Sequence, residues 1–462
     1  METFDLSNYE RVYFSGICGV SMSGLAKHLL SLGKKVGGSD KVFGEVSRQL
    51  ISMGAKVYRG NSDIYLKEFN PQLVVYSSAI SKENPEIQYA IKNEVPLVKR
   101  SQLLGQIVKG YKKSIAVCGS HGKTTTTLML AHVLISANKN PTVFAGGYDQ
   151  EFGNYRKGDN DIVVFEACEY ERNFLDVKPT HAIVLNIDND HMDTYKDLTE
   201  VQDAFKLFVR DSVCVINADD NLSSQIEHQT SVTFGIEESA TYTAKGIKDF
   251  RGGLIFTLYQ NGIKRQCLQL NVLGKHNLLN ALSVCAMANE MGVRGNYLKN
   301  GLLSFKGVSR RMEKIGEFNG KVCFADYAHH PTEIKATVNS LQGIISKNDE
   351  GDFLNEQDLF VFQPHTYSRT RFLINEFICV LSKIKNLIVY KSYPARETYD
   401  KEGSAKKLFN DLLKVSNGKV LYANTSKKLF EVVEQFPQCK RIFLLGAGDL
   451  YDKVKQIINK TK

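Results

Sequence analysis

Residues 116–127 read AVCGSHGKTTTT, an apolar run followed by glycines, a lysine and four threonines. A phosphate-binding loop needs glycines whose backbone N–H groups can point inward, a lysine for the phosphates, and a hydroxyl for magnesium at the start of a helix. This stretch has each of them, although Val117 stands where the usual GxxxxGK[ST] pattern has its first glycine. The spacing predicts a strand over 115–118 and a helix over 125–134, which is the context of a nucleotide-binding turn. A tight strand-to-helix turn with a chance lysine is the alternative.

The segments on both sides of this turn predict an α/β protein with three domains in series. We expect a Rossmann-like domain over 1–110, a central P-loop ATPase-like domain over 111–313, and a second Rossmann-like domain over 314–462. Short apolar runs predict the strands, at 11–17, 35–40, 55–58, 73–76, 97–98, 114–118, 162–166, 182–186, 213–217, 322–325, 359–362, 386–389 and 441–445, with a β-rich excursion over 231–270. Helical spacing occurs between them, most clearly at 23–32, 44–53, 85–93, 102–108 and 274–282.

The composition is that of a folded globular protein. Of the 462 residues, 43% are hydrophobic and 24% charged, and no apolar run is long enough to span a membrane. The first residues carry acids and have no basic region leading into an apolar one, so no signal peptide is predicted. Nine dispersed cysteines without a CxxC pair indicate reduced thiols, and hence a cytoplasmic protein. The net charge of +9 comes without a basic run, which favours a small acidic substrate over nucleic acid.

Two further residues are candidates for the chemistry around this turn. Glu166 closes a predicted strand, and His191 follows another, within NIDNDHMD over 186–193. Because ligands collect at the carboxyl ends of parallel strands, both side chains could reach a magnesium ion near Lys123. Each could equally be an ordinary capping or turn residue.

A spaced set of motifs resembles the Mur ligase family, the ATP-dependent enzymes that build the peptidoglycan stem peptide. The motifs run in family order and are GSHGKTTTT, FEACEYERNF, NIDNDHMD, LGKHNLLNAL, FKGVSRRME, DYAHHPTEI, FQPHTYSRT and GAGDLYD. The resemblance covers nearly the whole chain, and in that family the phosphate loop is short by nature. It implies an amide-forming ligase that uses ATP and Mg2+.

The resemblance also implies roles for individual residues. Lys123 would hold the ATP phosphates, and the metal ligands would be Thr124, Glu166 and His191. Asn277 and Asn280 would bind the adenine side of ATP, and Arg310 and Arg311 would face the phosphates. The remaining nucleotide-binding residues would be Gly119, Ser120, His121, Gly122, Thr125 and Asp326. The catalytic set would be Lys123, Glu166 and His191 together with His330 and His365.

Within the family, four features are similar to the member that adds L-alanine to UDP-N-acetylmuramate. They are the turn GICGVSMSG over 16–24, the pair DYAHHPTEI and FQPHTYSRT, the absence of a lysine at Ala204-Phe205, and the segment YPARE over 393–397. The substrates would then be UDP-N-acetylmuramate and L-alanine, held by Gly16, Gly19, Ser23, Asp40, Ser78, Tyr327 and Arg369. Cys18, Ser21 and Thr366 depart from the family pattern. We expect a monomer or homodimer with no nucleic-acid or membrane partner.

Four alternatives stay open from the sequence. A ligase that rejoins recycled tripeptide to the same sugar nucleotide is disfavoured by HHPTEI and FQPHTYSRT. Folylpolyglutamate synthase lacks the amino-terminal UDP-binding unit that residues 11–100 predict. A nicotinamide-dependent dehydrogenase explains the turn over 16–24 and Asp40 but not GSHGKT. A non-catalytic nucleotide-binding module would not need Glu166, His191 or the third-domain motifs.

Overall fold

The computed structural model describes residues 4–188, 194–226, 228, 231–250, 253–272, 274–341, 356–395 and 397–460. The chain divides into two compact units, and each is described by itself. The first comprises Met1–Ile247, Ile255–Asn271 and Asn277–Lys306, and the second Lys248–Leu254, Val272–His276 and Gly307–Lys462. Within the described ranges, no helix is both long enough and apolar enough to cross a membrane.

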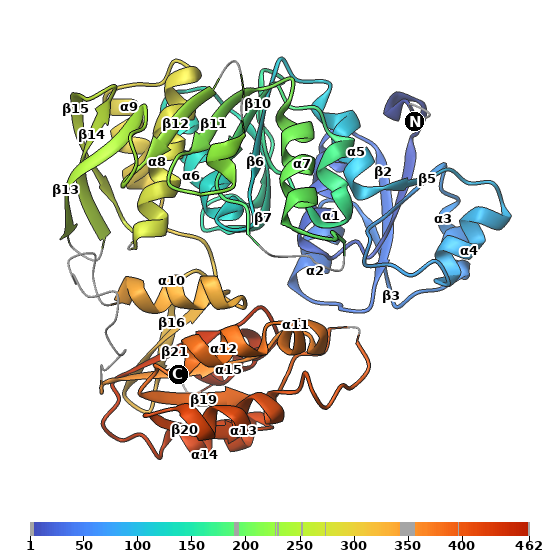
Figure 1. The fold of residues 1–462 in the computed structure, drawn as a ribbon. Coiled ribbons are helices and arrows are strands. Elements are labelled where there is room, and N and C mark those ends of the chain that lie inside the picture. The colour runs from blue at the N-terminus through green and yellow to red at the C-terminus, as the bar shows by residue number, and fades with distance from the viewer. Residues whose placement is uncertain are drawn as a thin grey trace. The chain divides into compact units, whose positions relative to one another are not determined.

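The amino-terminal part is a parallel five-stranded sheet in the order β3-β2-β1-β4-β5 (Figure 1). Its strands are β1 (Arg11–Ser15), β2 (Lys35–Asp40), β3 (Lys56–Arg59), β4 (Leu73–Tyr76) and β5 (Leu97–Lys99). Its helices are η1 (Leu6–Asn8), α1 (Val20–Ser31), α2 (Glu45–Ser52), α3 (Asp63–Phe69), α4 (Pro85–Lys92) and α5 (Arg100–Val108). Apolar side chains of β1 and β4 are buried on both faces, as expected for central strands of a parallel sheet. The β1–β2–β4 arrangement places the turn after β1 beside the end of β2.

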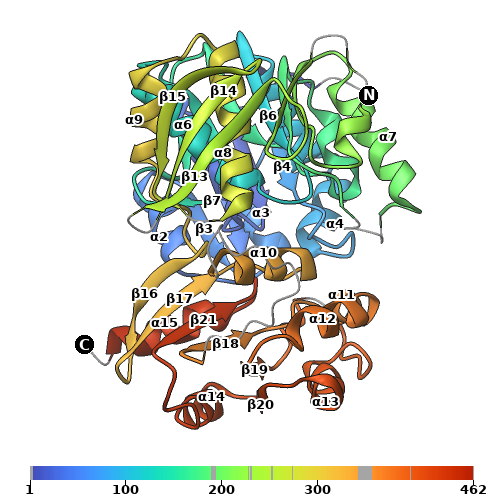
Figure 2. The ribbon, with the colours of Figure 1, turned by 60° about the vertical axis from the view of Figure 1, so that its left-hand side comes forward.

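The central part is a ten-stranded sheet in the order β15-β14-β13-β12-β11-β10-β6-β9-β7-β8. Its strands are β6 (Lys113–Cys118), β7 (Thr142–Asp149), β8 (Gly153–Arg156), β9 (Ile162–Glu166), β10 (His181–Val184), β11 (Val213–Asn217), β12 (Ser231–Gly235), β13 (Tyr242–Phe250), β14 (Gly253–Gln260) and β15 (Ile263–Leu270). Strands β13, β14 and β15 form its curved outer edge (Figure 2). β6 lies between β9 and β10 and is parallel to both. The carboxyl ends of these three strands therefore meet at one edge of the sheet.

Helices cover the central sheet, and one of them starts at the glycine turn. They are α6 (Lys123–Ser136), η2 (Tyr170–Asp176), α7 (Leu198–Val209), η3 (Ser223–Gln225), α8 (Lys275–Glu290) and α9 (Asn296–Ser304). α6 is buried over most of its length because it packs against α9 on one side and against strands β6, β7 and β9 on the other. A Cβ at Gly301 of α9 would come within 2.4 Å of the Cα of Val133 in α6. This close contact fixes the direction in which α6 leaves the turn.

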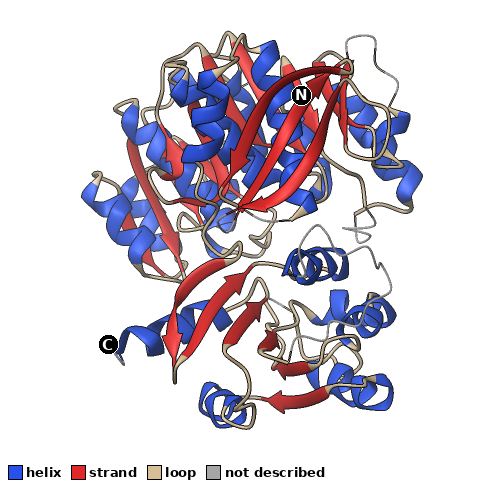
Figure 3. Cartoon of the chain, turned by 90° about the vertical axis from the view of Figure 1, so that its left-hand side faces the viewer, coloured by secondary structure: helices blue, strands red, loops and turns tan. Residues whose placement is uncertain are grey.

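The carboxy-terminal part is a six-stranded sheet in the order β16-β17-β21-β18-β19-β20, in which only β16 and β17 pair antiparallel. Its strands are β16 (Glu313–Phe318), β17 (Lys321–Asp326), β18 (Asp358–Phe362), β19 (Asn386–Tyr390), β20 (Lys419–Ala423) and β21 (Arg441–Leu445). Its helices are α10 (Pro331–Leu341), α11 (Tyr367–Phe372), α12 (Ile374–Leu381), α13 (Ala405–Val415), α14 (Ser426–Val433) and α15 (Leu450–Lys460). Buried apolar clusters lie on both faces of this sheet, and Figure 3 shows its strands in red between blue helices.

Contacts between α1 and β8 join the amino-terminal part to the central part, and they are called the α1–β8 contact below. The Asn154 amide donates to the carbonyl of Val20 at 2.6 Å and to the hydroxyl of Ser23 at 3.0 Å. Lys27 Nζ donates to Asn154 Oδ1 at 2.8 Å, and His28 Nδ1 lies 3.0 Å from the Tyr155 hydroxyl. These buried polar contacts explain why two sheets belong to one compact unit.

The predicted fold class is confirmed, since the three sheets are successive α/β assemblies along the chain. The predicted bounds of β2, β4, β9, β11 and β21 agree with the structure, and most of the other predicted elements differ at their ends by a few residues. Strands β7, β8, β16 and β20 were not predicted. The domain limits at 110 and 313 stay predictions.

Candidate active site

The turn between β6 and α6, Gly119–Gly122, is short because its backbone requires glycine at both ends. Gly119 has φ +137° and Gly122 has φ +85°, values that side-chain-bearing residues rarely adopt. A Cβ on Gly119 would lie 3.0 Å from Leu185 Cβ, and one on Gly122 would lie 2.7 Å from Asn280 Oδ1. Val117 is a buried residue of β6. The β6–α6 turn is therefore a complete, compact turn and not a longer loop with a lost glycine.

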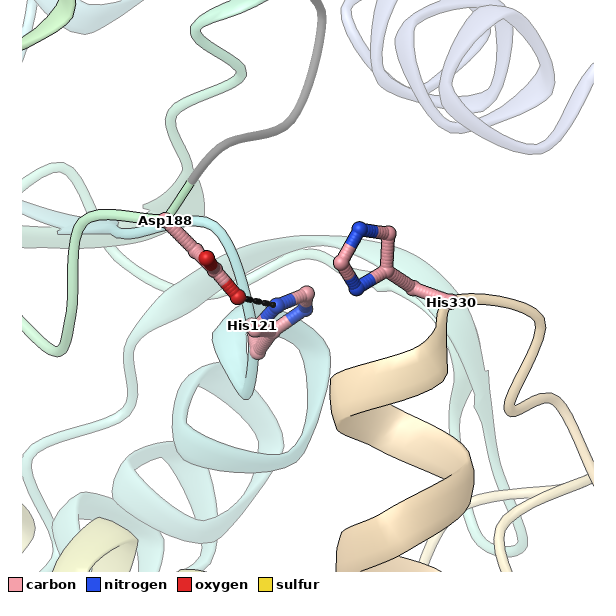
Figure 4. Close-up of side chains that lie close together, drawn as sticks. All are labelled: His121, Asp188 and His330. Carbon is pink, nitrogen blue, oxygen red and sulfur yellow. Dashed lines mark hydrogen bonds and ion pairs between the residues drawn. The ribbon is translucent and has the colours of Figure 1, made fainter. Parts of the chain in front are cut away.

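The segment that follows β10 holds this turn in place. The carbonyl of Asn186 accepts from Ser120 N at 3.0 Å, and its side-chain Oδ1 accepts from His121 N at 2.8 Å. Asp188 N donates to the Ser120 hydroxyl at 2.9 Å. The imidazole of His121 contacts the Asp188 carboxylate, with Nε2 and Oδ2 3.0 Å apart (Figure 4). Ser120 and His121 are thus fixed by a neighbouring strand end.

Lys123, the first residue of α6, folds back over the turn. Its ammonium donates to the carbonyls of Gly119 and Ser120 and to both carboxylate oxygens of Glu169, the latter at 3.0 Å each. The Glu169 side chain is 2% exposed and that of Lys123 is 17% exposed. Burial alone lowers the pKa of Lys123, but the opposing charge of Glu169 and further negative groups outweigh it and raise the pKa above its ordinary value. The ammonium is therefore charged at neutral pH.

Thr124 and Glu166 come together beside Lys123. The Thr124 hydroxyl donates to Glu166 Oε2 at 3.0 Å, and the other carboxylate oxygen accepts from Gly146 N. A Cβ on Gly146 would lie 2.7 Å from the Glu166 carboxylate, so a larger residue there would displace this carboxylate from its present position. A hydroxyl and a carboxylate oxygen are the hard donors that Mg2+ prefers, and this pair fits a magnesium ion. The third predicted ligand, His191, lies outside the described residues.

Asn277 and Asn280 lie one turn apart on α8. Asn280 Nδ2 donates to Asn277 Oδ1 at 3.4 Å, and Asn280 is buried against Gly122. Thr125 is buried in the first turn of α6. The structure therefore brings the predicted nucleotide residues of the central domain to one place around the β6–α6 turn.

The β1–α1 turn, Gly16–Gly19, is organised by β2. Gly16 has φ +81°, and the N–H groups of Gly16 and Ile17 donate to the carbonyl of Ser39 at 2.9 and 3.0 Å. Asp40 accepts from Cys18 N at 3.0 Å and from Val42 N at 2.9 Å, so its carboxylate fixes backbone on both sides. Each of these partners belongs to the same turn or to the loop after β2.

The other two predicted substrate residues of this part lie elsewhere. Ser23 is fully buried in the α1–β8 contact, where its hydroxyl donates to Val20 O and accepts from Asn154. This position suits packing between the two sheets better than contact with a substrate. Ser78 is part-buried and its hydroxyl accepts from Asn173 Nδ2 at 3.3 Å.

In the second unit, Arg310 and Arg311 gather around aromatic rings. The guanidinium of Arg310 lies 5.2 Å from the Tyr327 ring and 4.8 Å from the Tyr451 ring, and it donates to the carbonyls of Gly446 and Gly448. The Arg311 guanidinium lies 5.3 Å from the same Tyr327 ring. The predicted arginines therefore form one cationic and aromatic cluster with Tyr327.

Histidines extend this cluster. The His329 ring lies 5.3 Å from Tyr327 and 5.6 Å from His365, which stacks on Tyr393. Among the described residues, no hydrogen-bond partner is found for the buried Nδ1 of His365. Burial, with the nearby charges of His329, Arg369 and Arg310, lowers the pKa of His365 to about 3. Its ring is therefore neutral at physiological pH.

Asp326 and His330 are both buried in this unit. Asp326 accepts from Met312 N at 3.0 Å and Ala328 N at 2.8 Å, and burial raises its pKa despite the charge of Arg311. His330 lies directly before α10 (Figure 4), and its Nδ1 accepts from Thr332 N at 3.3 Å. The Asp326 carboxylate thus braces backbone around the end of β17.

The sequence did not single out Glu169, Asn186 or Asp188, although all three lie in quoted motifs. The signal for Glu169 was a second carboxylate three residues after Glu166. Its placement depends on Glu171 and Arg172, which have φ +49° and +55°. Consecutive non-glycine residues in the left-handed backbone conformation cost about 1–2 kcal/mol each and have no clear sequence signature.

Three family models match the chain. They are described as Mur ligase family, catalytic domain (residues 11–112), Mur ligase middle domain (117–288) and Mur ligase, glutamate ligase domain (310–448).

Curated relatives match over almost their full length. A UDP-N-acetylmuramate–L-alanine ligase from Clostridium kluyveri is 41% identical over 99% of this chain and 100% of the relative. A protein of the same name from Aquifex aeolicus is 36% identical over 96% of this chain and 95% of the relative. The crystal structure of a UDP-N-acetylmuramate–alanine ligase from Thermotoga maritima superimposes with a TM-score of 0.82 at 30% identity, covering 98% of this chain and 99% of that one.

Proposed function

The chain belongs to the Mur ligase family, and from this premise we propose that it joins L-alanine to the lactyl carboxylate of UDP-N-acetylmuramate, converting ATP to ADP and phosphate. The observation that carries the proposal is the full-length identity of 41% to a relative named for this reaction. The pairing of Thr124 with Glu166 next to Lys123 supports the ATP-dependent part. The product would be the first intermediate of a peptidoglycan stem peptide, made in the cytoplasm.

The reaction needs activation because a carboxylate is a poor electrophile. Transfer of the γ-phosphoryl group of ATP to the lactyl carboxylate gives an acyl phosphate and ADP. The alanine amine then attacks the acyl carbon, the C–O bond to phosphate breaks, and an amide and inorganic phosphate form. This sequence of steps requires no covalent link to the enzyme.

In this mechanism Lys123 provides positive charge at the phosphates, which is mainly positioning and electrostatic work. The amino terminus of α6 would add its dipole. Thr124 and Glu166 would hold Mg2+, which when bound neutralises charge on the phosphate oxygens. For Arg310 and Arg311 we propose the phosphate-binding role that the family resemblance implies.

His365 is suited to bind the amino group of alanine. Its neutral ring can accept a hydrogen bond from an ammonium group, whereas a pKa of about 3 makes it a weak base. We therefore assign it to orienting the amine, with His330 beside the same motifs as a second candidate. Tyr327 and Arg369 are the assigned substrate contacts of this unit, and Asp40 with Gly16 and Gly19 those of the first unit.

Phosphate release with UDP-N-acetylmuramate and ATP tests the proposal directly. L-Alanine, serine, glycine and the recycled tripeptide are supplied as separate acceptors, and the product is identified by mass. We expect the highest kcat/KM with L-alanine. Preference for the tripeptide would replace the proposal by the recycling ligase, and release without any acceptor product would exclude both.

A further inference from the structure

All the N–H donors of the Lys123 ammonium already have acceptors in this structure. An ammonium group has three N–H donors, and four acceptor oxygens surround this one: two turn carbonyls and the two carboxylate oxygens of Glu169. An incoming phosphate oxygen must displace at least one of them. Glu169 is the only charged acceptor among the four, so it is the strongest competitor.

The segment that carries Glu169 is fixed from several sides. The Tyr195 hydroxyl donates to the carbonyl of Glu169 at 2.6 Å, and Arg172 N donates to the same carbonyl at 2.9 Å. Arg172 also pairs with Glu200, and its guanidinium lies 5.6 Å from the Tyr195 ring. Two consecutive left-handed residues, Glu171 and Arg172, persist only where the surroundings determine the backbone in this way. The fold therefore holds the segment that places the Glu169 carboxylate at Lys123.

We infer that Glu169 is a positioning residue of the nucleotide site, whose buried carboxylate holds the Lys123 ammonium over the β6–α6 turn and competes with the nucleotide phosphates for it. This inference rests on the proposed function and adds to it a residue that sets nucleotide affinity. The competition weakens binding of ATP and ADP, while the fixed ammonium position favours transfer and the release of ADP. The Glu169 side chain then lowers the affinity for nucleotides and at the same time raises the turnover rate.

Glu169→Gln tests this because the amide keeps the size of the side chain and removes its charge. We expect the Kd for ADP, measured by calorimetry, to fall about 5-fold, and kcat to fall at least 5-fold together with the KM for ATP. Adenosine has no phosphate, so its Kd should be the same as in the wild type. A purely structural role would weaken ADP binding and would not discriminate between ADP and adenosine.

Glu171→Gln is the matched control, since this residue lies in the same segment and its carboxylate pairs with Lys99, at 3.9 Å, and not with Lys123. Its Kd for ADP should stay at the wild-type value. Should Glu169→Gln fail to fold, Glu169→Asp withdraws the carboxylate by one methylene and should lower the Kd for ADP about 2-fold. Unchanged or weaker ADP binding in the folded variant overturns the inference. Failure of the proposed function is seen separately, as a wild-type protein that binds ADP but does not ligate alanine.

Discussion

The β6–α6 turn and the β1–α1 turn are the same structural element with different contents. Each follows a buried parallel strand, begins with a glycine of positive φ and leads into a helix. Charged side chains surround the β6–α6 turn: Lys123 pairs with Glu169, Glu166 accepts from Thr124, and His121 contacts Asp188. The β1–α1 turn contains no charged residue, and the carboxylate of Asp40 holds only its backbone.

This difference separates two ways of building an anion site. One turn places a buried cation and a candidate metal pair, which suits chemistry on a phosphoryl group. The N–H groups of the other turn are bound to Ser39, Asp40 and Gly16, and a pyrophosphate that does not react would bind at the amino terminus of α1, which follows this turn. Removing a side chain should therefore damage turnover at the first turn and substrate affinity at the second.

The largest effect is expected from Lys123→Ala. Loss of the ammonium removes the main protein charge at the phosphates, and kcat should fall about 100-fold or more, the scale of one charge-stabilising group. Steady-state phosphate release measures this. A kcat within a few-fold of the wild type would remove Lys123 from the mechanism.

Stability needs a separate control, because Lys123→Ala leaves the buried Glu169 carboxylate without its partner. Breaking a buried pair from one side costs about 3–5 kcal/mol of unfolding free energy. The double variant with Glu169→Gln removes both charges and should recover much of that stability. It should remain as inactive as Lys123→Ala, which separates catalysis from folding.

Asp40→Asn should weaken the β1–α1 turn. The amide loses the charge and offers one acceptor oxygen where the carboxylate holds two N–H groups, so the turn loses part of its order. Losing about 1.4 kcal/mol of binding is tenfold, and we expect the KM for UDP-N-acetylmuramate to rise about 10-fold. The KM for ATP should not change. Asp63→Asn, on an exposed ion pair of α3, is the matched control, and an equal rise there would contradict the assignment.

Much of the fold was predictable because its central strands are short apolar runs between turns. In β7, which contains Gly146 and Gly147, and in β8, which is only GNYR, the hydrophobic pattern is too weak to predict a strand. β7 pairs with β9 and β8 pairs with β7, so both strands form through their neighbours. β20 was missed for a similar reason, since Lys419–Ala423 alternates poorly. Local sequence therefore predicts strands that bury both faces better than those that depend on a neighbour.

The candidate site shows the same limit. Lys123, Thr124 and Glu166 could be predicted because a motif fixes their spacing to a strand end. Glu169 could not, because its direction depends on left-handed backbone at Glu171 and Arg172. Ser23 was predicted as a substrate contact from the family resemblance of the turn over 16–24, and the structure places it in the α1–β8 contact.

A smaller effect concerns the α1–β8 contact, which joins the parts that carry the two turns. Burial, with the charge of Lys157, lowers the pKa of His28 to about 4, against about 6.5 in an unfolded chain. The unfolded state therefore binds the proton first, so stability is full above pH 6.5 and is lost as pH falls towards 4. Between pH 7 and pH 5 we expect the wild type to lose about 1–2 kcal/mol more unfolding free energy than His28→Gln. Urea titrations at both pH values measure this, and equal losses would show that His28 does not govern the contact.

The smallest effect is expected from Cys18→Gly, at a position of the β1–α1 turn where the sequence departs from the expected family pattern. The structure gives no conformational need for glycine there, because the positive φ is at Gly16 and not at Cys18. The contact with Asp40 uses the backbone N–H of Cys18, which glycine retains. Burial and the Asp40 carboxylate raise the pKa of the Cys18 thiol to about 12, so no charge is lost. The KM for UDP-N-acetylmuramate should stay within about 2-fold, and the melting temperature should fall slightly, since glycine loses about 0.5–1 kcal/mol more on ordering. A large gain in affinity would instead mean that the thiol obstructs the substrate, and the second turn would then be limited by a side chain after all.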